Sequence, residues 1–75
     1  MQTLASLADG HVGRLVRLEG SPSFRRRLME FGLLPGTTVR VVRRAELGGV
    51  LELEVRQTRL SVRIQEAQAL VVDAP

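Results

Sequence analysis

The stretch RRRLMEFGLLPGT, residues 25–37, decides the fold, because it predicts a basic helix that ends at a glycine and turns sharply into a strand. Ser21 can cap this helix by accepting a backbone hydrogen bond, and Pro22 suits the first helical position. Gly32 lies where the chain must enter the left-handed region, which a residue without a Cβ does at little cost. The helix is therefore predicted to start after Ser21 and to stop at Gly32.

The helix is also predicted to bury one apolar stripe, since Phe24, Leu28 and Phe31 recur at the spacing of a single helix face. A type II turn should come next. Pro35 presets φ at its second position, and Gly36 supplies a positive φ at its third. We expect a strand to follow this turn at once.

Two later strands are predicted at 51–56 and 59–64, where apolar and polar residues alternate. A two-residue turn at residues 57 and 58 would place Glu52 opposite Arg63. That turn contains no glycine, so a tight type I′ turn is doubtful, and a longer loop with another register stays open as an alternative.

The remaining strands are predicted at 13–19, 38–44 and 70–72, with a short helical turn before the last of them. The chain shows no repeat and no alternation of strands with long helices. This pattern predicts a mostly β fold, a small antiparallel barrel of five to six short strands with one α-helix inserted after the first strand. We expect residues 1–75 to form a single domain.

Composition narrows the class of protein. The 75 residues include eleven arginines and no lysine against eight acidic residues, which gives a formal net charge of +3. There is no cysteine, so disulfides and thiolate metal sites are unavailable. The N-terminus lacks the pattern of a signal peptide, and no apolar run approaches the roughly 18 residues needed to cross a bilayer. We therefore expect a cytoplasmic protein that is not inserted in a membrane.

The chain resembles the FeoA family, whose members carry a basic helix, a glycine and a proline-glycine turn before a strand of valines. The residues that match this signature are Arg27, Leu28, Gly32, Leu33, Pro35 and Gly36, with Phe31 in place of the usual leucine. The resemblance extends from about residue 4 to residue 72. It implies an SH3-like barrel and a non-enzymatic accessory protein of bacterial ferrous iron uptake. The implied partner is the cytosolic part of the FeoB transporter.

The residue inventory gives no sign of catalysis. One histidine, no cysteine and no tyrosine leave no convincing pair of nucleophile and base, so no catalytic residue is predicted. A ferrous site normally recruits several imidazoles and carboxylates, which His11 alone cannot supply. We predict no metal ligand and no cofactor, and weak binding of a transition metal at His11 remains the alternative.

The predicted partner-binding residues are Arg25, Arg26, Met29 and Leu47. Arg25 and Arg26 lie in the first half of the helix, where the helix dipole disfavours cations. They are either a solvated face or a patch for an acidic partner or phosphate. Met29 lies about 140° from Phe24 on the helical wheel, away from the stripe predicted to be buried, and should be exposed among the arginines. Leu47 is a second exposed candidate, at the tip of the loop after the strand at 38–44.

Two alternative functions stay open, a small basic nucleic-acid-binding barrel and a regulatory SH3-like barrel. Only two aromatic residues are present, which argues against stacking on single-stranded bases. The SH3-like domain of iron-dependent repressors would require a preceding pair of DNA-binding helices, which this sequence lacks. Nucleic acid is therefore not the expected partner, and the sequence leaves the oligomeric state open.

Overall fold

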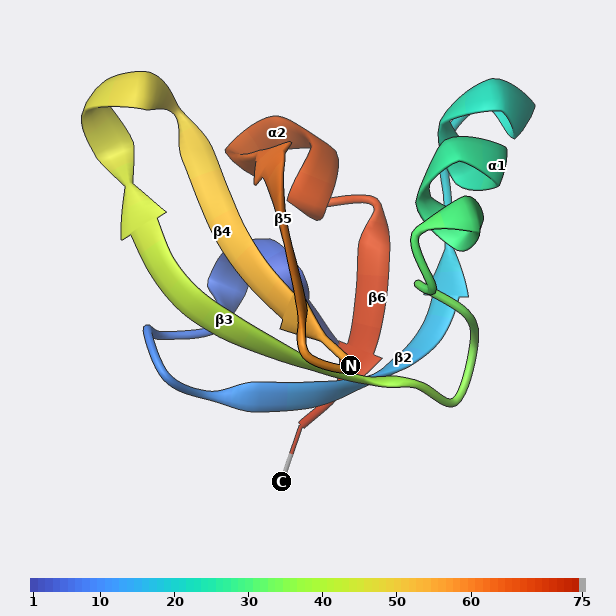
Figure 1. Ribbon diagram of the computed structural model, residues 1–75, viewed down its shortest axis with the longest axis horizontal. Helices are drawn as coiled ribbons and strands as arrows, with labels where there is room; N and C mark the ends of the chain where they lie inside the picture. Colours follow the sequence, from blue (N-terminus) through green and yellow to red (C-terminus); the bar gives the residue numbers. More distant parts are fainter. Residues whose placement is uncertain (75) are drawn as a thin grey trace.

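The computed structural model describes residues 1–74 and shows a six-stranded antiparallel sheet that curls into a small barrel (Figure 1). The strands are β1 (Gln2–Thr3), β2 (Val12–Leu18), β3 (Thr38–Ala45), β4 (Val50–Val55), β5 (Thr58–Arg63) and β6 (Leu70–Asp73). The helical elements are α1 (Pro22–Glu30), the short α2 (Ile64–Ala67) and the 3-10 turns η1 (Leu4–Ser6) and η2 (Glu46–Gly48). The predicted fold class, a small SH3-like antiparallel barrel with one α-helix, is confirmed. The helix was expected after the first strand and follows the second, because the two-residue strand β1 precedes the strand that the sequence predicts at 13–19.

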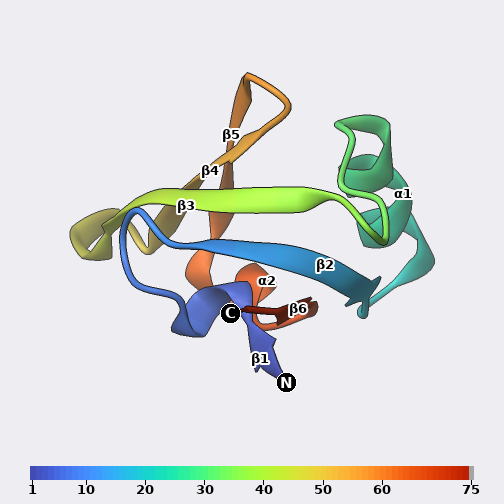
Figure 2. The ribbon, with the colours of Figure 1, turned by 90° about the horizontal axis from the view of Figure 1, so that it is seen from below.

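The strand order is β1-β6-β2-β3-β4-β5, so β2 to β5 form a meander and β6 returns to pair with β2. Two irregularities bend the sheet, one in β2 between Leu15 and Arg17 and one in β3 between Val41 and Arg43. Figure 2 shows β2 and β3 running side by side, with α1 at one end of them. The curl leaves β1 and β5 as the two edges of the sheet.

The core is aliphatic and lies inside the curl of the sheet. Its fully buried large side chains are Leu4, Leu15, Leu28, Leu33, Val39, Val41, Leu51, Leu53, Val55, Leu70 and Val72. Most of them come from alternate positions of the strands, as a sheet with one buried face requires. α1 contributes Leu28, and η1 contributes Leu4. No helix among residues 1–74 is long and apolar enough to span a membrane.

The ends of α1 follow the sequence closely. Ser21 Oγ accepts a hydrogen bond from the Phe24 N–H at 3.2 Å, and Gly32 takes a φ of +98° just after the helix. The N–H of Leu33 then donates to the Leu28 carbonyl at 3.1 Å, while the Gly32 N–H donates to Met29 at 3.0 Å. These two bonds define a Schellman motif, which buries Leu33 beside Leu28.

The predicted apolar stripe is wrong at its last residue. Phe31 is 53% exposed, whereas Leu28 is 2% exposed and Phe24 is half-buried. The helix ends at Glu30, so Phe31 is its C-cap and no longer follows helical spacing. The reversal at Gly32 brings Leu33 into the core instead. The type II turn after it is confirmed, because Gly36 has a φ of +92° and the Thr37 N–H donates to Leu34 at 3.0 Å.

The predicted register of the β4–β5 hairpin is also wrong. The turn consists of Arg56 and Gln57, whose φ angles of +50° and +69° give a tight turn of the type I′ kind without glycine. Glu52 therefore lies opposite Ser61 rather than Arg63. Because the register shifts by two residues, the same side chains still face the core. The carboxylates of β4 pair with β3 instead, at 3.6 Å between Glu52 and Arg43 and 3.8 Å between Glu54 and Arg40.

The left-handed turn predicts a stabilising substitution. Gln57→Gly removes the Cβ that opposes a positive φ, and we expect the free energy of unfolding to rise by about 0.5 to 1 kcal/mol. Urea unfolding of both proteins measures the difference. Thr58→Gly, one residue further in extended backbone, is the matched control and should destabilise the fold. Equal losses from both substitutions would contradict a strained turn.

Candidate functional site

A shallow groove of about 430 Å³ runs beside the outer face of α1. We call it the helix groove. Its lining residues are Arg17, Leu18, Pro22, Arg25, Arg26, Met29 and Pro35. They come from the end of β2, from α1 and from the turn that follows it (Figure 1).

Helical periodicity explains which side chains of α1 face the helix groove. Pro22, Arg25, Arg26 and Met29 follow an i, i+3, i+4, i+7 spacing, which places them on one face. Leu28 points into the core from the other side of the helix. The Schellman motif buries Leu28, and this burial sets the rotation of α1 about its axis. The rotation in turn determines which side chains of α1 line the helix groove.

The three adjacent arginines of α1 differ in their environment. Arg27 donates to Glu66 at 3.1 Å, and its guanidinium lies 5.7 Å from the centre of the Phe24 ring. It therefore ties α1 to α2. Arg25 and Arg26 form no ion pair with any residue in the described part of the chain.

The helix groove combines an apolar floor with a positive rim. Met29 is 39% exposed, and Leu18 and Pro35 lie beside it. Arg25 and Arg26 are exposed at the rim. Arginine and methionine are both favoured at protein interfaces, one as a bidentate partner of carboxylates and the other as an adaptable apolar contact. The groove suits a protein segment that carries an apolar side chain next to carboxylates.

The structure brings together three of the four residues predicted to bind a partner. Arg25, Arg26 and Met29 line the helix groove, as described above. Leu47 is fully exposed, at 108%, but it lies in η2 at the other end of the molecule from α1 (Figures 1 and 2). The sequence did not predict Arg17 and Leu18 as groove residues, because the bulge after Leu15 shifts the register of β2.

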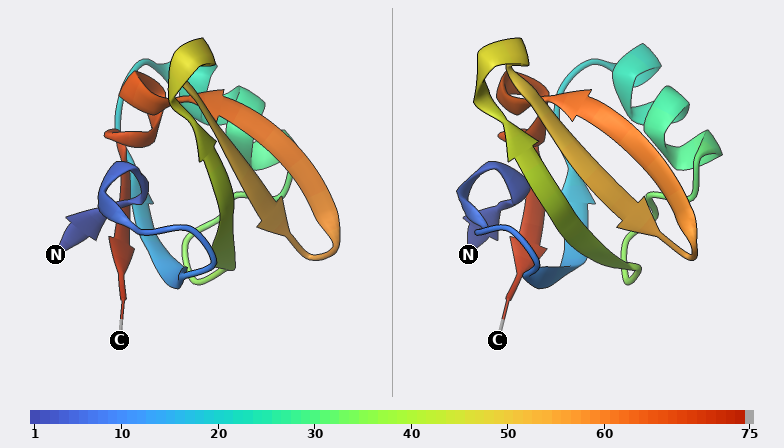
Figure 3. Two further views of the ribbon diagram at one scale, coloured as in Figure 1. Left: turned by 90° about the vertical axis from the view of Figure 1, so that its left-hand side faces the viewer. Right: turned by 60° about the vertical axis from the view of Figure 1, so that its left-hand side comes forward.

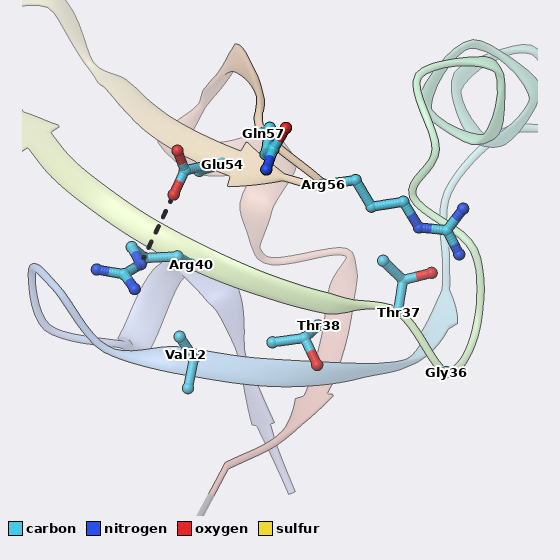
Figure 4. Close-up of a pocket in the computed structure, with 8 residues that line it drawn as sticks. All are labelled: Val12, Gly36, Thr37, Thr38, Arg40, Glu54, Arg56 and Gln57. Atoms are coloured by element: carbon cyan, nitrogen blue, oxygen red, sulfur yellow. Dashed lines mark ion pairs between the residues drawn. The ribbon is translucent and has the colours of Figure 1, made fainter.

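A second hollow, of about 490 Å³, lies on the outer face of the sheet (Figure 4). Its lining residues are Val12, Gly36, Thr37, Thr38, Arg40, Glu54, Arg56 and Gln57. The ion pair of Arg40 with Glu54 occupies one end, and Arg56 extends from the strained turn toward Thr37 at the other. This hollow is polar and of mixed charge, and it contains no nucleophile beside a base.

The single histidine lines neither of these two hollows. His11 is exposed in the loop before β2, where it lines a small depression with Gly10, Val12 and Ala74. Among the side chains that the structure describes, no three of histidine, cysteine, aspartate or glutamate gather as they would around a metal ion. The structure thus offers no set of ligands to join His11.

Comparison with known proteins gives a consistent match. A family model described as the FeoA domain matches residues 2–74. A Porphyromonas gingivalis protein named as a fusion of Fe(2+) transport protein A with the Fe(2+) transporter FeoB is 31% identical over 70 residues. The aligned region covers 93% of this chain but only 8% of the fusion protein.

Solved structures share the fold. The solution structure of the FeoA protein from Chlorobium tepidum is 32% identical, with a TM-score of 0.91 over 97% of this chain and 70% of that one. A manganese-dependent transcriptional repressor also reaches a TM-score of 0.91, at 23% identity, over 99% of this chain and 41% of the repressor. The likeness to the repressor shows the fold alone.

The link between α1 and α2 predicts a pH-dependent contribution to stability. The Arg63 N–H donates to the Glu66 carboxylate at 2.9 Å, and this bond is the main cause that lowers the pKa of Glu66 below its ordinary value of 4.5. Partial burial raises the pKa, and the nearby Arg27 guanidinium lowers it further. A lowered pKa stabilises the fold above pH 4.5, and the contribution is lost as the pH falls through the folded-state value. Glu66→Gln keeps an acceptor oxygen but cannot ionise.

We expect wild type to exceed Glu66→Gln in unfolding free energy at pH 7 by up to about 1 kcal/mol. The difference should vanish on acidification below pH 4.5. Urea unfolding from pH 7 to pH 3 measures it. Glu30→Gln makes the same change of charge at an exposed site without an ion pair among the described residues. Its free energy of unfolding should equal that of wild type at each pH. A constant difference for Glu66→Gln at every pH would contradict the assignment.

Proposed function

Because this chain belongs to the FeoA family, which is associated with ferrous iron transport, we propose that it is a non-enzymatic cytosolic accessory protein of bacterial ferrous iron uptake. It acts by binding the cytosolic part of a FeoB-type transporter. The observation that carries the proposal is the fusion of a similar domain with FeoB in one polypeptide. Fusion keeps the two domains at a high local concentration. A separate chain must bind its partner through a contact surface to stay equally close to it.

The helix groove is the surface that we propose for this contact. Arg25 and Arg26 bind carboxylates of the transporter, and Met29 packs against an apolar side chain between them. Two cations near the N-terminal end of a helix cost stability rather than add to it, which a binding role would offset. Leu47, exposed at the opposite end of the molecule, provides a second and separate contact.

A regulatory or nucleic-acid-binding barrel is the second candidate, since a transcriptional repressor contains the same fold. The helix groove has no aromatic side chain among its lining residues, so bases would find no surface on which to stack. Binding to nucleic acid would then depend on phosphate contacts and would weaken steeply with salt. That dependence separates it from a protein contact with an apolar centre.

Capture from a solubilised membrane extract tests the proposal. The tagged wild-type chain should retain a ferrous iron transporter, and Arg26→Glu with Met29→Glu should reduce retention at least about tenfold, as loss of an interface centre does. Leu47→Asp should cause a smaller, separate loss. Retention of nucleic acid that disappears with salt, and no membrane partner, would favour the second candidate.

The matched control is Arg14→Glu with Val12→Glu, which makes the same changes of charge and polarity away from the helix groove. Val12 lines the hollow of Figure 4, and Arg14 lies two residues further along β2, opposite Thr38. Val12 is 36% exposed, close to the 39% of Met29, so each double variant replaces an apolar side chain of similar exposure. Thermal unfolding must show that both remain folded. Equal retention by wild type and the groove variant would refute the proposed contact surface.

A further inference from the structure

One edge of the sheet is open along a full strand. β5 is the last strand in the sheet order, and β4 covers only one of its sides. β1, at the other edge, is two residues long, whereas β5 has six. In Figure 1 and in the right-hand view of Figure 3, α1 stands beyond β5 on the side away from β4, without joining the sheet. The unpaired side of β5 therefore faces the space between the barrel and α1.

The hairpin register shows which backbone groups point to that side. Val55 pairs with Thr58 across the two-residue turn, and hydrogen-bonded pairs alternate with open ones along an antiparallel ladder. The groups of Arg59 and Ser61 thus point away from β4, and no backbone hydrogen bond joins either to another element of the described chain. The Arg63 N–H beyond them is already bound to Glu66.

A groove of about 490 Å³ lies along this edge. We call it the edge groove. Its lining residues are Arg27, Leu28, Phe31, Val50, Arg59, Leu60, Ser61, Val62, Arg63 and Glu66. Leu60 and Phe31 provide partly exposed apolar surface, and three arginines outnumber the single carboxylate, which already pairs with Arg27. The groove is therefore positive at its rim and apolar toward α1.

The arginines along the edge groove indicate which kind of strand could pair with β5. An antiparallel pair of β5 strands from two copies, centred on Ser61, would place Arg59 of each copy opposite Arg63 of the other, and like charges directly opposite one another are unfavourable. A strand with acidic residues at alternate positions would instead meet these arginines with opposite charge. Its intervening residues would face Phe31 and the apolar side of the groove.

We propose that the edge groove binds an extended acidic peptide segment, which adds an antiparallel or parallel strand to β5. The backbone of Arg59 and Ser61 supplies the new ladder, Arg59 and Arg63 bind alternate carboxylates, and Phe31 covers the apolar side chains between them. This explains the exposure of Phe31, which packing of the chain alone does not require. The surface lies on the opposite flank of α1 from the helix groove and does not depend on the proposed function.

The test uses a seven-residue peptide of alternating glutamate and valine with blocked ends. We expect the amides of Arg59 and Ser61 to exchange with solvent at least tenfold more slowly at saturating peptide, measured by NMR. The amides of Arg25 and Met29 should not change. A peptide of alternating lysine and valine should cause no protection, and neither should the glutamate peptide with alternate backbone nitrogens methylated.

Two variants, each with a matched control, separate the contribution of backbone pairing from that of charge. Ser61→Pro removes an edge N–H that β4 does not use and should abolish binding, whereas Ser61→Ala should bind like wild type. Arg59→Glu with Arg63→Glu should weaken binding at least tenfold, and Arg43→Glu with Arg14→Glu should not. Failure of the glutamate peptide to protect Arg59 and Ser61 at millimolar concentration would overturn the proposal. Equal binding of the methylated peptide would also overturn it, even if Ser61→Pro does not fold.

Discussion

The end of α1 at Gly32 is the constraint on which the rest of the molecule depends. Its left-handed backbone lets the Leu33 N–H reach back to the Leu28 carbonyl, and both leucines enter the core. A helix of nine residues has little stability by itself, so this anchorage sets its position and its rotation. The same reversal leaves Phe31 outside the core. Both grooves lie on the flanks of α1 and therefore follow from how the helix ends.

The arginines of this fold differ in whether they have a partner within the chain. Arg27 bridges to Glu66 and joins α1 to α2, and Arg44 donates to the carbonyls of Ala5 and Leu7 and so holds η1 against β3. These arginines have partners within the chain. Arg25 and Arg26 have no such ion pair among the side chains that the structure describes, and they lie where the helix dipole disfavours them. The contrast is physical support for a binding role of this face, because the fold gains nothing from their charge.

Local signals in the sequence determined the parts of the structure that were predicted correctly. The Ser21 cap, the Gly32 stop and the Pro35–Gly36 turn each depend on backbone rules that act over a few residues, and all three are confirmed. Phe31 could not be placed correctly, because helical spacing was extended one residue past the helix end. The hairpin register was wrong because Arg56 and Gln57 adopt left-handed backbone that usually favours glycine or asparagine. That strain is tolerated only because β4 and β5 fix it from both sides.

The part of the helix groove that α1 contributes could be predicted from the sequence, because it also depends on a local signal. Met29, Arg25 and Arg26 share one helix face, so periodicity alone places them together. Arg17 and Leu18 join them only through the pairing of β2 with β6 and the bulge in β2, which are non-local. The edge groove was not anticipated, since an open strand edge is a property of sheet topology. The sequence pattern shows which residues share a helix or strand face, but only the folded structure shows which of these faces lie next to one another.

The central claim is that the outer face of α1 contacts the transporter, and methionine methyl NMR tests it most directly. The chain has two methionines, Met1 and Met29, so labelling their methyl groups gives two signals. On titration with the cytosolic domain of a FeoB-type transporter, the account predicts that the Met29 signal shifts and broadens while the Met1 signal changes little. A complex that forms while the Met29 signal keeps its position and width would contradict it.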